Sequence, residues 1–355
     1  MKRIIASIGL LAAIFGGLDA VRAETKTIRV GFCAKTISSA ASPFAVAAKM
    51  GWFEKAGIKV DLIPVAGSTD CVKFVATKDL LFALPSIEPL AIIRGQGVKA
   101  KNYYTAYQGN IYGIAVPESS SIKSVEDLKG KKIGVTSMAS GGVMVARALV
   151  AQQGFNPDHD VSLIVVGEAA QAAALTAAKQ VDALSLYDVQ FALVQNAGVK
   201  LRFIDYPAIT RFPSNGFIAL EETLRDRRAD AIAVAQAYAK GQIFAITNPE
   251  AAIRIMYEVY PFTKPTGKDE ATAIADDLKA INARIKNWLL APAGVTKWGE
   301  NSEVNYANYV DWLVKNGVLK EKMPVSDLIT NELIDEINKF DQDEIKKLAK
   351  DYKPG

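Results

Sequence analysis

Residues 132–142, KIGVTSMASGG, join a short β-type run to a loop of small residues. A helical pattern follows over residues 143–153 and ends at a glycine. The same order occurs near the start of the chain, where TIRVGF at residues 27–32 leads into a loop over residues 33–42 and a helical pattern over residues 44–55. Strand, loop and helix in this order are the building unit of an α/β fold. We therefore expect an α/β protein.

The correspondence between the two stretches continues along the chain. β-branched runs predict strands at residues 58–65 and 161–166, and apolar runs predict strands at 80–84 and 181–184. Gly67 then matches Gly167, and Glu88 matches Asp188, with the same offset of 100 residues. Such a repeat predicts two similar α/β lobes rather than one long sheet. The alternative is a chance match between segments of similar composition.

Two extended segments separate the copies. Residues 102–116 are rich in Tyr with two glycines, and residues 203–218 contain two prolines and a glycine. We expect the chain to cross between lobes at both places, so that residues 24–112 and 212–355 form the first lobe and residues 113–211 the second. The mostly helical pattern over residues 221–352 is expected to complete the first lobe.

The N-terminus has the order of a secretory signal peptide. Met1-Lys2-Arg3 is basic, residues 4–18 are mostly apolar, and Val21-Arg22-Ala23 offers a cleavage site after Ala23. We therefore predict that residues 1–23 are removed and that the mature protein is periplasmic. An N-terminal membrane anchor is the alternative, although the apolar run is shorter than the roughly 20 residues that span a bilayer.

The composition of the chain restricts the partners and the kinds of site that we expect. The net charge of +4 falls to +2 without the signal peptide, and no basic tract is interleaved with aromatic residues, so nucleic acid is not an expected partner. The single histidine, His159, lies in a polar turn-like stretch. We expect no metal, no cofactor and no catalytic residues, because the chain has no cysteine cluster, metal-ligand spacing or phosphate-binding glycine loop.

Candidate binding residues follow from the predicted topology. Ligands of open α/β sheets sit beyond the carboxyl ends of the strands, where helix N-termini favour anions. The loops at these ends and the lobe crossings supply the candidates Ser38, Ser39, Ser68, Thr69, Ser86, Glu88, Tyr112, Ser137, Ser140, Gly141, Tyr187, Asp188 and Asn215.

Each kind of candidate also has a structural interpretation. The serines and Thr69 could cap helices, the two tyrosines could pack, and the two acids could face solvent. If instead Glu88 and Asp188 face the cleft, they would suit an amine or ring N–H group of a ligand. Cys33 and Cys71 lie in loops at the same end of the first predicted sheet, and we hypothesise that they form a disulfide.

Three segments carry a resemblance to a known family. IRVG at residues 28–31, GWFEKAGI at 51–58 and VEDLKGKKIGV at 125–135 resemble the nitrate/sulfonate/taurine family of periplasmic binding proteins, which also includes binders of thiamine-pyrimidine precursors. Tyr187-Asp188 matches an aromatic–acidic pair of that family, whereas residues 74–82 and 177–183 lack the glycine of its strand-entry pattern.

The resemblance implies a type II-like two-lobed fold with a ligand cleft between the lobes and two hinge crossings. It implies a monomeric solute-binding component of an ABC import system, which captures a small polar or anionic molecule such as a sulfonate, taurine or nitrate and delivers it to an inner-membrane permease. A pyrimidine-precursor binder, or a pyrimidine-precursor synthase-like enzyme on the same fold, is the alternative. A secreted sensor that presents its ligand to a receptor is a third hypothesis.

Overall fold

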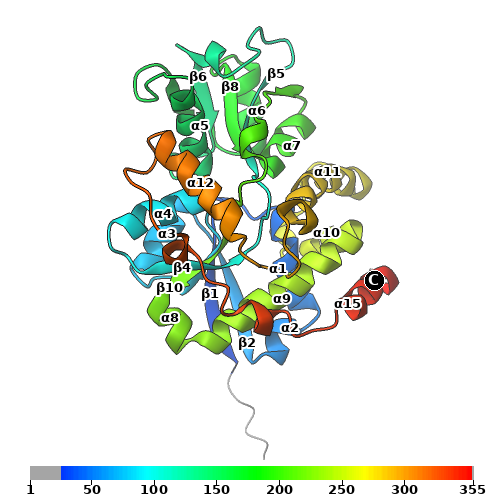
Figure 1. Cartoon of the computed structure of the whole chain (residues 1–355). Coiled ribbons are helices and arrows are strands. Elements are labelled where there is room, and N and C mark those ends of the chain that lie inside the picture. Colours follow the sequence, from blue (N-terminus) through cyan, green and yellow to red (C-terminus); the bar gives the residue numbers. More distant parts are fainter. Residues whose placement is uncertain (1–24, 354–355) are drawn as a thin grey trace, which may run out of the picture.

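The computed structural model describes residues 25–353, so the predicted signal peptide lies outside the described residues. Two five-stranded sheets form two lobes, one above the other in Figure 1. Their strand orders are β2-β1-β3-β10-β4 and β7-β6-β8-β5-β9. In each sheet three strands are parallel and the fourth strand in the order is antiparallel to both of its neighbours. The prediction of two similar α/β lobes is thus confirmed.

The strands of the first sheet are β1 (Lys26–Phe32), β2 (Ile58–Pro64), β3 (Phe82–Ala83), β4 (Ala100–Thr105) and β10 (Gly216–Leu220). Those of the second sheet are β5 (Tyr112–Pro117), β6 (Lys132–Val135), β7 (Ser162–Val165), β8 (Ala183–Tyr187) and β9 (Leu201–Phe203). β5 follows β4 in the chain but pairs with β8, and β10 returns to pair with β3. The chain therefore crosses between lobes twice, as predicted.

The helices that accompany the sheets are α1 (Ser42–Lys49), α2 (Trp52–Lys55), α3 (Ser68–Ala76) and α4 (Ile87–Gly95) in the first lobe, and α5 (Gly141–Gln152), α6 (Ala169–Ala177) and α7 (Asp188–Asn196) in the second. Short 3-10 turns cover Ser39–Ala41, Glu126–Leu128, Pro207–Ile209, Pro261–Thr263 and Ala291–Ala293. The C-terminal helices are α8 (Glu221–Asp226), α9 (Arg228–Thr247), α10 (Pro249–Val259), α11 (Glu270–Trp288), α12 (Glu303–Lys315), α13 (Val325–Leu328), α14 (Ile334–Ile337) and α15 (Gln342–Asp351).

Two local predictions were wrong in extent. The helix expected over residues 44–55 is divided into α1 and α2, because Gly51 adopts a left-handed conformation with φ of 67°. The strand expected over residues 80–84 is reduced to the two residues of β3. Leu80 and Leu84 are nevertheless buried, so the apolar run reflects burial rather than strand length.

The C-terminal helices do more than complete the first lobe. α11 packs against α7 of the second lobe, and the Asn196 side-chain amide donates a hydrogen bond to the Asp276 carbonyl at 2.9 Å. Trp312 on α12 donates from Nε1 to Gln152 Oε1 at 3.1 Å. Figure 1 shows both helices at the level where the lobes meet. The C-terminal helices therefore also contact the second lobe.

Apolar residues of the first lobe are buried around an aromatic group. Phe44, Phe217 and Tyr238 are fully buried, and their ring centroids lie 4.8–5.9 Å apart. β10 is buried along its whole length, as expected for a central strand. Within residues 25–353, no helix is both long and apolar enough to cross a bilayer.

Candidate functional site

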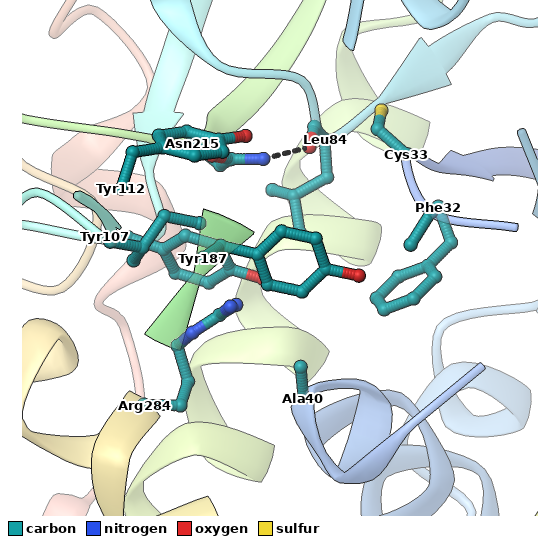
Figure 2. Close-up of a pocket in the computed structure, with 11 residues that line it drawn as sticks. Phe32, Cys33, Ala40, Leu84, Tyr107, Tyr112, Tyr187, Asn215 and Arg284 are labelled. Carbon is teal, nitrogen blue, oxygen red and sulfur yellow. Dashed lines mark hydrogen bonds between the residues drawn. The ribbon is translucent and has the colours of Figure 1, made fainter. Parts of the chain in front are cut away.

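A small cavity of about 20 Å³ lies where the two lobes and α11 meet. The first lobe contributes loops that follow β1 and β3 or precede β10, and the second lobe contributes the ends of β5 and β8. Figure 2 shows the tyrosine side chains and the Arg284 guanidinium directed toward this space. The lining residues are Phe32, Cys33, Ala34, Ala40, Leu84, Tyr107, Ile111, Tyr112, Tyr187, Asn215 and Arg284. Of the predicted site residues, Tyr112, Tyr187 and Asn215 line the cavity.

Predicted residues from both lobes converge beside Tyr112. The Ser68 hydroxyl accepts a hydrogen bond from the Ser86 amide at 2.9 Å, which ties the start of α3 to the start of α4. Gly141 of the second lobe faces this pair, because a Cβ atom at Gly141 would lie 2.4 Å from Ser86 Oγ and 2.8 Å from Tyr112 Oη. Ser86 Oγ is buried without a hydrogen-bond partner among the described residues. The Ser86 hydroxyl in this polar cluster can therefore form a further hydrogen bond.

Glu88 lies behind the cluster and is only 1% exposed. The Tyr309 hydroxyl donates a hydrogen bond to Glu88 Oε1, while Oε2 has no partner within residues 25–353. Burial raises the pKa of the carboxyl group, and the neighbouring hydroxyl groups oppose that rise only in part. Burial also raises the pKa of Tyr112, and the nearby Glu88 charge raises it further.

Asp188 occupies the corresponding position in the second lobe, at the first residue of α7. Arg284 on α11 donates to both of its carboxylate oxygens, with N–O distances of 2.6–2.9 Å. Asn287 donates a further hydrogen bond from Nδ2 at 3.0 Å, and the Val189 amide donates at 2.7 Å. Because these donors occupy the carboxylate, the hypothesis that Asp188 receives a ligand amine does not fit this structure.

Other predicted residues make contacts across the cleft. Ser137 Oγ donates to the Ala66 carbonyl at 2.7 Å, and the Thr69 amide donates to the Ala139 carbonyl at 3.0 Å. At the rim, Glu168 of the second lobe accepts hydrogen bonds from the Lys35 amide and the Thr36 hydroxyl of the first. The lobes are thus in direct contact.

The remaining predicted residues have mixed surroundings. Ser140 caps α5 by accepting from the Gly142 amide at 3.2 Å. Asn215 donates to the Leu84 carbonyl at 2.8 Å (dashed in Figure 2), and its own carbonyl accepts from Tyr107, so it joins the two lobe crossings. Ser38 and Ser39 precede α1, and their buried hydroxyls have no partner among the described residues. Neither of them lines the cavity.

Cys33 and Cys71 are joined by a disulfide with a Cα–Cα distance of 5.9 Å. Cys33 lines the cavity, and Cys71 is a buried residue of α3. The bond therefore connects the loop after β1 to the helix whose N-terminus meets the second lobe. Within residues 25–353, no group of three or more His, Cys, Asp or Glu side chains is arranged to hold a metal ion.

Three important residues were absent from the prediction: Arg284, Tyr107 and Tyr309. Burial lowers the pKa of Arg284, but its neighbours, with Asp188 foremost, together raise it by more, so the guanidinium is held in its charged form. One sequence signal could have revealed it. Arg284 falls on the same face of α11 as Ile281 and Trp288, which are both buried, and a charge on an apolar stripe is unusual.

A family model described as "NMT1/THI5 like" matches residues 38–252, which is more than half of the chain. The chain belongs to the NMT1/THI5-like family. A similar protein of Bacillus subtilis (strain 168), whose name assigns it to aliphatic sulfonate binding, is 31% identical over 143 residues. That match covers 39% of this NMT1/THI5-like chain and 42% of the relative, so it spans less than half the length of either protein.

Solved structures of periplasmic binding proteins share the fold of this NMT1/THI5-like protein. The alkanesulfonate-binding protein SsuA of Xanthomonas axonopodis pv. citri, bound to MOPS, has a TM-score of 0.65 at 16% identity, over 87% of this chain and 99% of that one. The nitrate-binding protein NrtA of Synechocystis PCC 6803 has a TM-score of 0.62 at 16% identity, over 93% and 99% of the two chains. At this identity the similarity establishes the periplasmic binding protein fold.

Proposed function

We propose that this protein is the solute-binding component of an ABC import system and captures a small polar or anionic organic molecule by closing its two lobes. The observation that carries the proposal is the cavity between the lobes, where polar side chains from both lobes and from α11 converge. A molecule held by groups of both lobes stabilises the closed form relative to the open form, which gives a permease a distinct state to recognise. The named functions of the similar proteins agree with this role.

Ligand-dependent thermal stabilisation tests the proposal. A panel of alkanesulfonates, taurine, nitrate, short carboxylates and pyrimidines is added to the purified mature protein. The binding partner is expected to raise the melting temperature, because a ligand at roughly 100 times its dissociation constant stabilises the folded state by about 2.7 kcal/mol. Absence of any shift, together with no small molecule released on denaturation and detected by mass spectrometry, would count against the proposal.

Export and monomeric behaviour belong to the same proposal. Residues 1–23 have the sequence of a signal peptide, and cleavage after Ala23 would leave Glu24 as the first residue of a periplasmic protein. The intact mass of the protein recovered from the periplasm tests the cleavage site. Light scattering of that sample tests the monomer.

The enzyme hypothesis makes a different prediction for the same bound molecule. A transport component releases its ligand unchanged, whereas a synthase-like enzyme converts it. Incubating the protein with the stabilising compound and comparing the compound's mass before and after separates the two. We expect no change of mass.

A further inference from the structure

The guanidinium of Arg284 has two differently occupied edges. Nε and Nη2 donate to the carboxylate of Asp188, at 2.9 Å and 2.6 Å from Oδ1. Nη1 has no hydrogen-bond partner among the described residues, and it is not among the polar atoms sealed inside the protein. Arg284 lines the cavity, and Nη1 carries two N–H groups that no described residue accepts.

The position of Arg284 is unusual for a basic side chain. It is 2% exposed and is the only buried Lys or Arg within residues 25–353. Its guanidinium carbon lies 4.1 Å from the centre of the Tyr107 ring, a cation–π contact that holds one face of the group. Figure 2 shows the guanidinium close to the Tyr107 and Tyr187 side chains. A buried charge fixed on one edge and one face is preorganised to bind with its free edge.

Asp188 supplies the buried counter-charge of Arg284. Its carboxylate neutralises Arg284 and fixes the plane of the guanidinium group. Asn287 in turn holds the carboxylate in place. A planar guanidinium held in this way suits the oxygens of a sulfonate or carboxylate, which accept paired N–H groups. The rest of the lining includes Phe32, Ala40 and Ile111, which can contact a hydrocarbon group.

We infer that Arg284 is a specificity-determining residue that binds the anionic head of an organic ligand through Nη1, with Asp188 as its positioning residue. This inference rests on the proposed function and narrows the ligand class to small organic anions with an apolar part. The free edge of the guanidinium binds the head, and the apolar side chains of the first lobe contact the tail.

Isothermal titration with paired probes tests the inference. Straight-chain sulfonates of two to six carbons are compared with the matching neutral sulfonamides, which have nearly the same shape. The wild type should prefer the sulfonate. Arg284→Gln should weaken sulfonate binding roughly 10- to 100-fold, the loss expected for hydrogen bonds to a charged group, and should change sulfonamide binding little. The sulfonate affinity of Arg284→Lys should lie between those of the wild type and Arg284→Gln, because lysine keeps the charge but lacks the planar guanidinium.

Arg254→Gln is the matched control, because Arg254 forms ion pairs with Glu250 and Glu270 on an exposed surface. It should leave both affinities unchanged. An Arg284→Gln protein that keeps the wild-type ratio of sulfonate to sulfonamide affinity overturns the inference. So does a wild type that binds the sulfonamides and not the sulfonates, a result that leaves the proposed function intact. A wild type that binds no compound of the whole panel contradicts both.

Asp188→Asn provides a second measurement in case Arg284→Gln does not fold. Removing the carboxylate leaves Arg284 without its buried counter-charge, so the melting temperature without ligand should fall. A bound sulfonate would then supply the missing negative charge, and its stabilising shift should exceed that of the wild type. A purely structural ion pair predicts an equal or smaller shift, which would overturn the inference.

Discussion

Glu88 illustrates how much a single residue depends on its surroundings. In the sequence it stands near the start of a helix, where acidic residues are common on the surface. In the structure it is buried, and Tyr309, which is 221 residues further along the chain, donates to its carboxyl group. Burial raises the pKa of this carboxyl group. The folded protein therefore favours the protonated form more than the unfolded chain does.

This raised pKa predicts a specific pH dependence. The contribution of Glu88 to the free energy of unfolding is fully present below the unfolded pKa of about 4.3 and is lost as pH rises through the folded pKa. Glu88→Gln cannot ionise, so its stability relative to the wild type should increase between pH 4 and pH 8. Urea unfolding of both proteins across this range measures the difference. A difference that is constant with pH would contradict the prediction.

Tyr309→Phe tests the hydrogen bond in the same pocket. The variant keeps the ring that stacks on Phe212 at 4.6 Å but removes the donor to Glu88. It should lower the free energy of unfolding at neutral pH by about 1–3 kcal/mol, the usual cost of leaving a buried polar group without its partner. In the Glu88→Gln background the loss should be smaller, because no carboxylate is then left unpaired.

At the scale of elements, the disulfide connects the loop after β1 to α3. The bonded cysteines are 38 residues apart, a loop length for which chain entropy predicts a stabilisation of about 4 kcal/mol. Urea unfolding with and without reductant should show a loss of roughly 2–4 kcal/mol on reduction. The double variant Cys33→Ser and Cys71→Ser serves as control and should be insensitive to reductant. Two free thiols in non-reduced peptides would refute the pairing.

At the scale of the molecule, closure brings Gly67 of the first lobe against the backbone of the second. A Cβ atom at Gly67 would lie 2.5 Å from the Ala139 carbonyl carbon and oxygen. Its φ of 167° is extended backbone that any residue can adopt, so the glycine is needed for close approach and not for its own conformation. Gly67→Ala should therefore obstruct closure without destabilising either lobe.

Small-angle scattering and titration measure this effect. With a panel compound that stabilises the wild type, the wild-type radius of gyration should decrease, while Gly67→Ala should remain expanded and bind at least about 10-fold more weakly. Its unliganded melting temperature should be unchanged or slightly higher. Gly113→Ala is the matched control, because no atom of the described residues lies within 4 Å of its Cβ position. Normal closure of Gly67→Ala would show that the lobes meet differently in solution.

Local sequence patterns predicted several of the strands, because strand formation depends on the side chains of adjacent residues. Alternating and β-branched runs predicted β1, β2, β6 and β7 to within a residue or two, because strand formation and burial follow side-chain pattern. The break at Gly51 was missed, since a left-handed glycine inside an apolar helical pattern has no distinctive periodicity. The two-residue β3 was overestimated, because buried apolar runs look alike in strands and loops.

The sequence by itself determined that this protein has two α/β lobes of the same plan and that loops rich in serine and glycine lie between them. Both conclusions rest on periodicity and on an internal repeat, which can be recognised directly in the order of the residues. Only the tertiary structure decided that Asp188 is bound to Arg284 and that Glu88 is bound to Tyr309. These partners come from helices outside the repeat, and linear order does not specify where a distant helix places one side chain. The position of the Arg284 guanidinium at the cavity is therefore a property of the packing of α11.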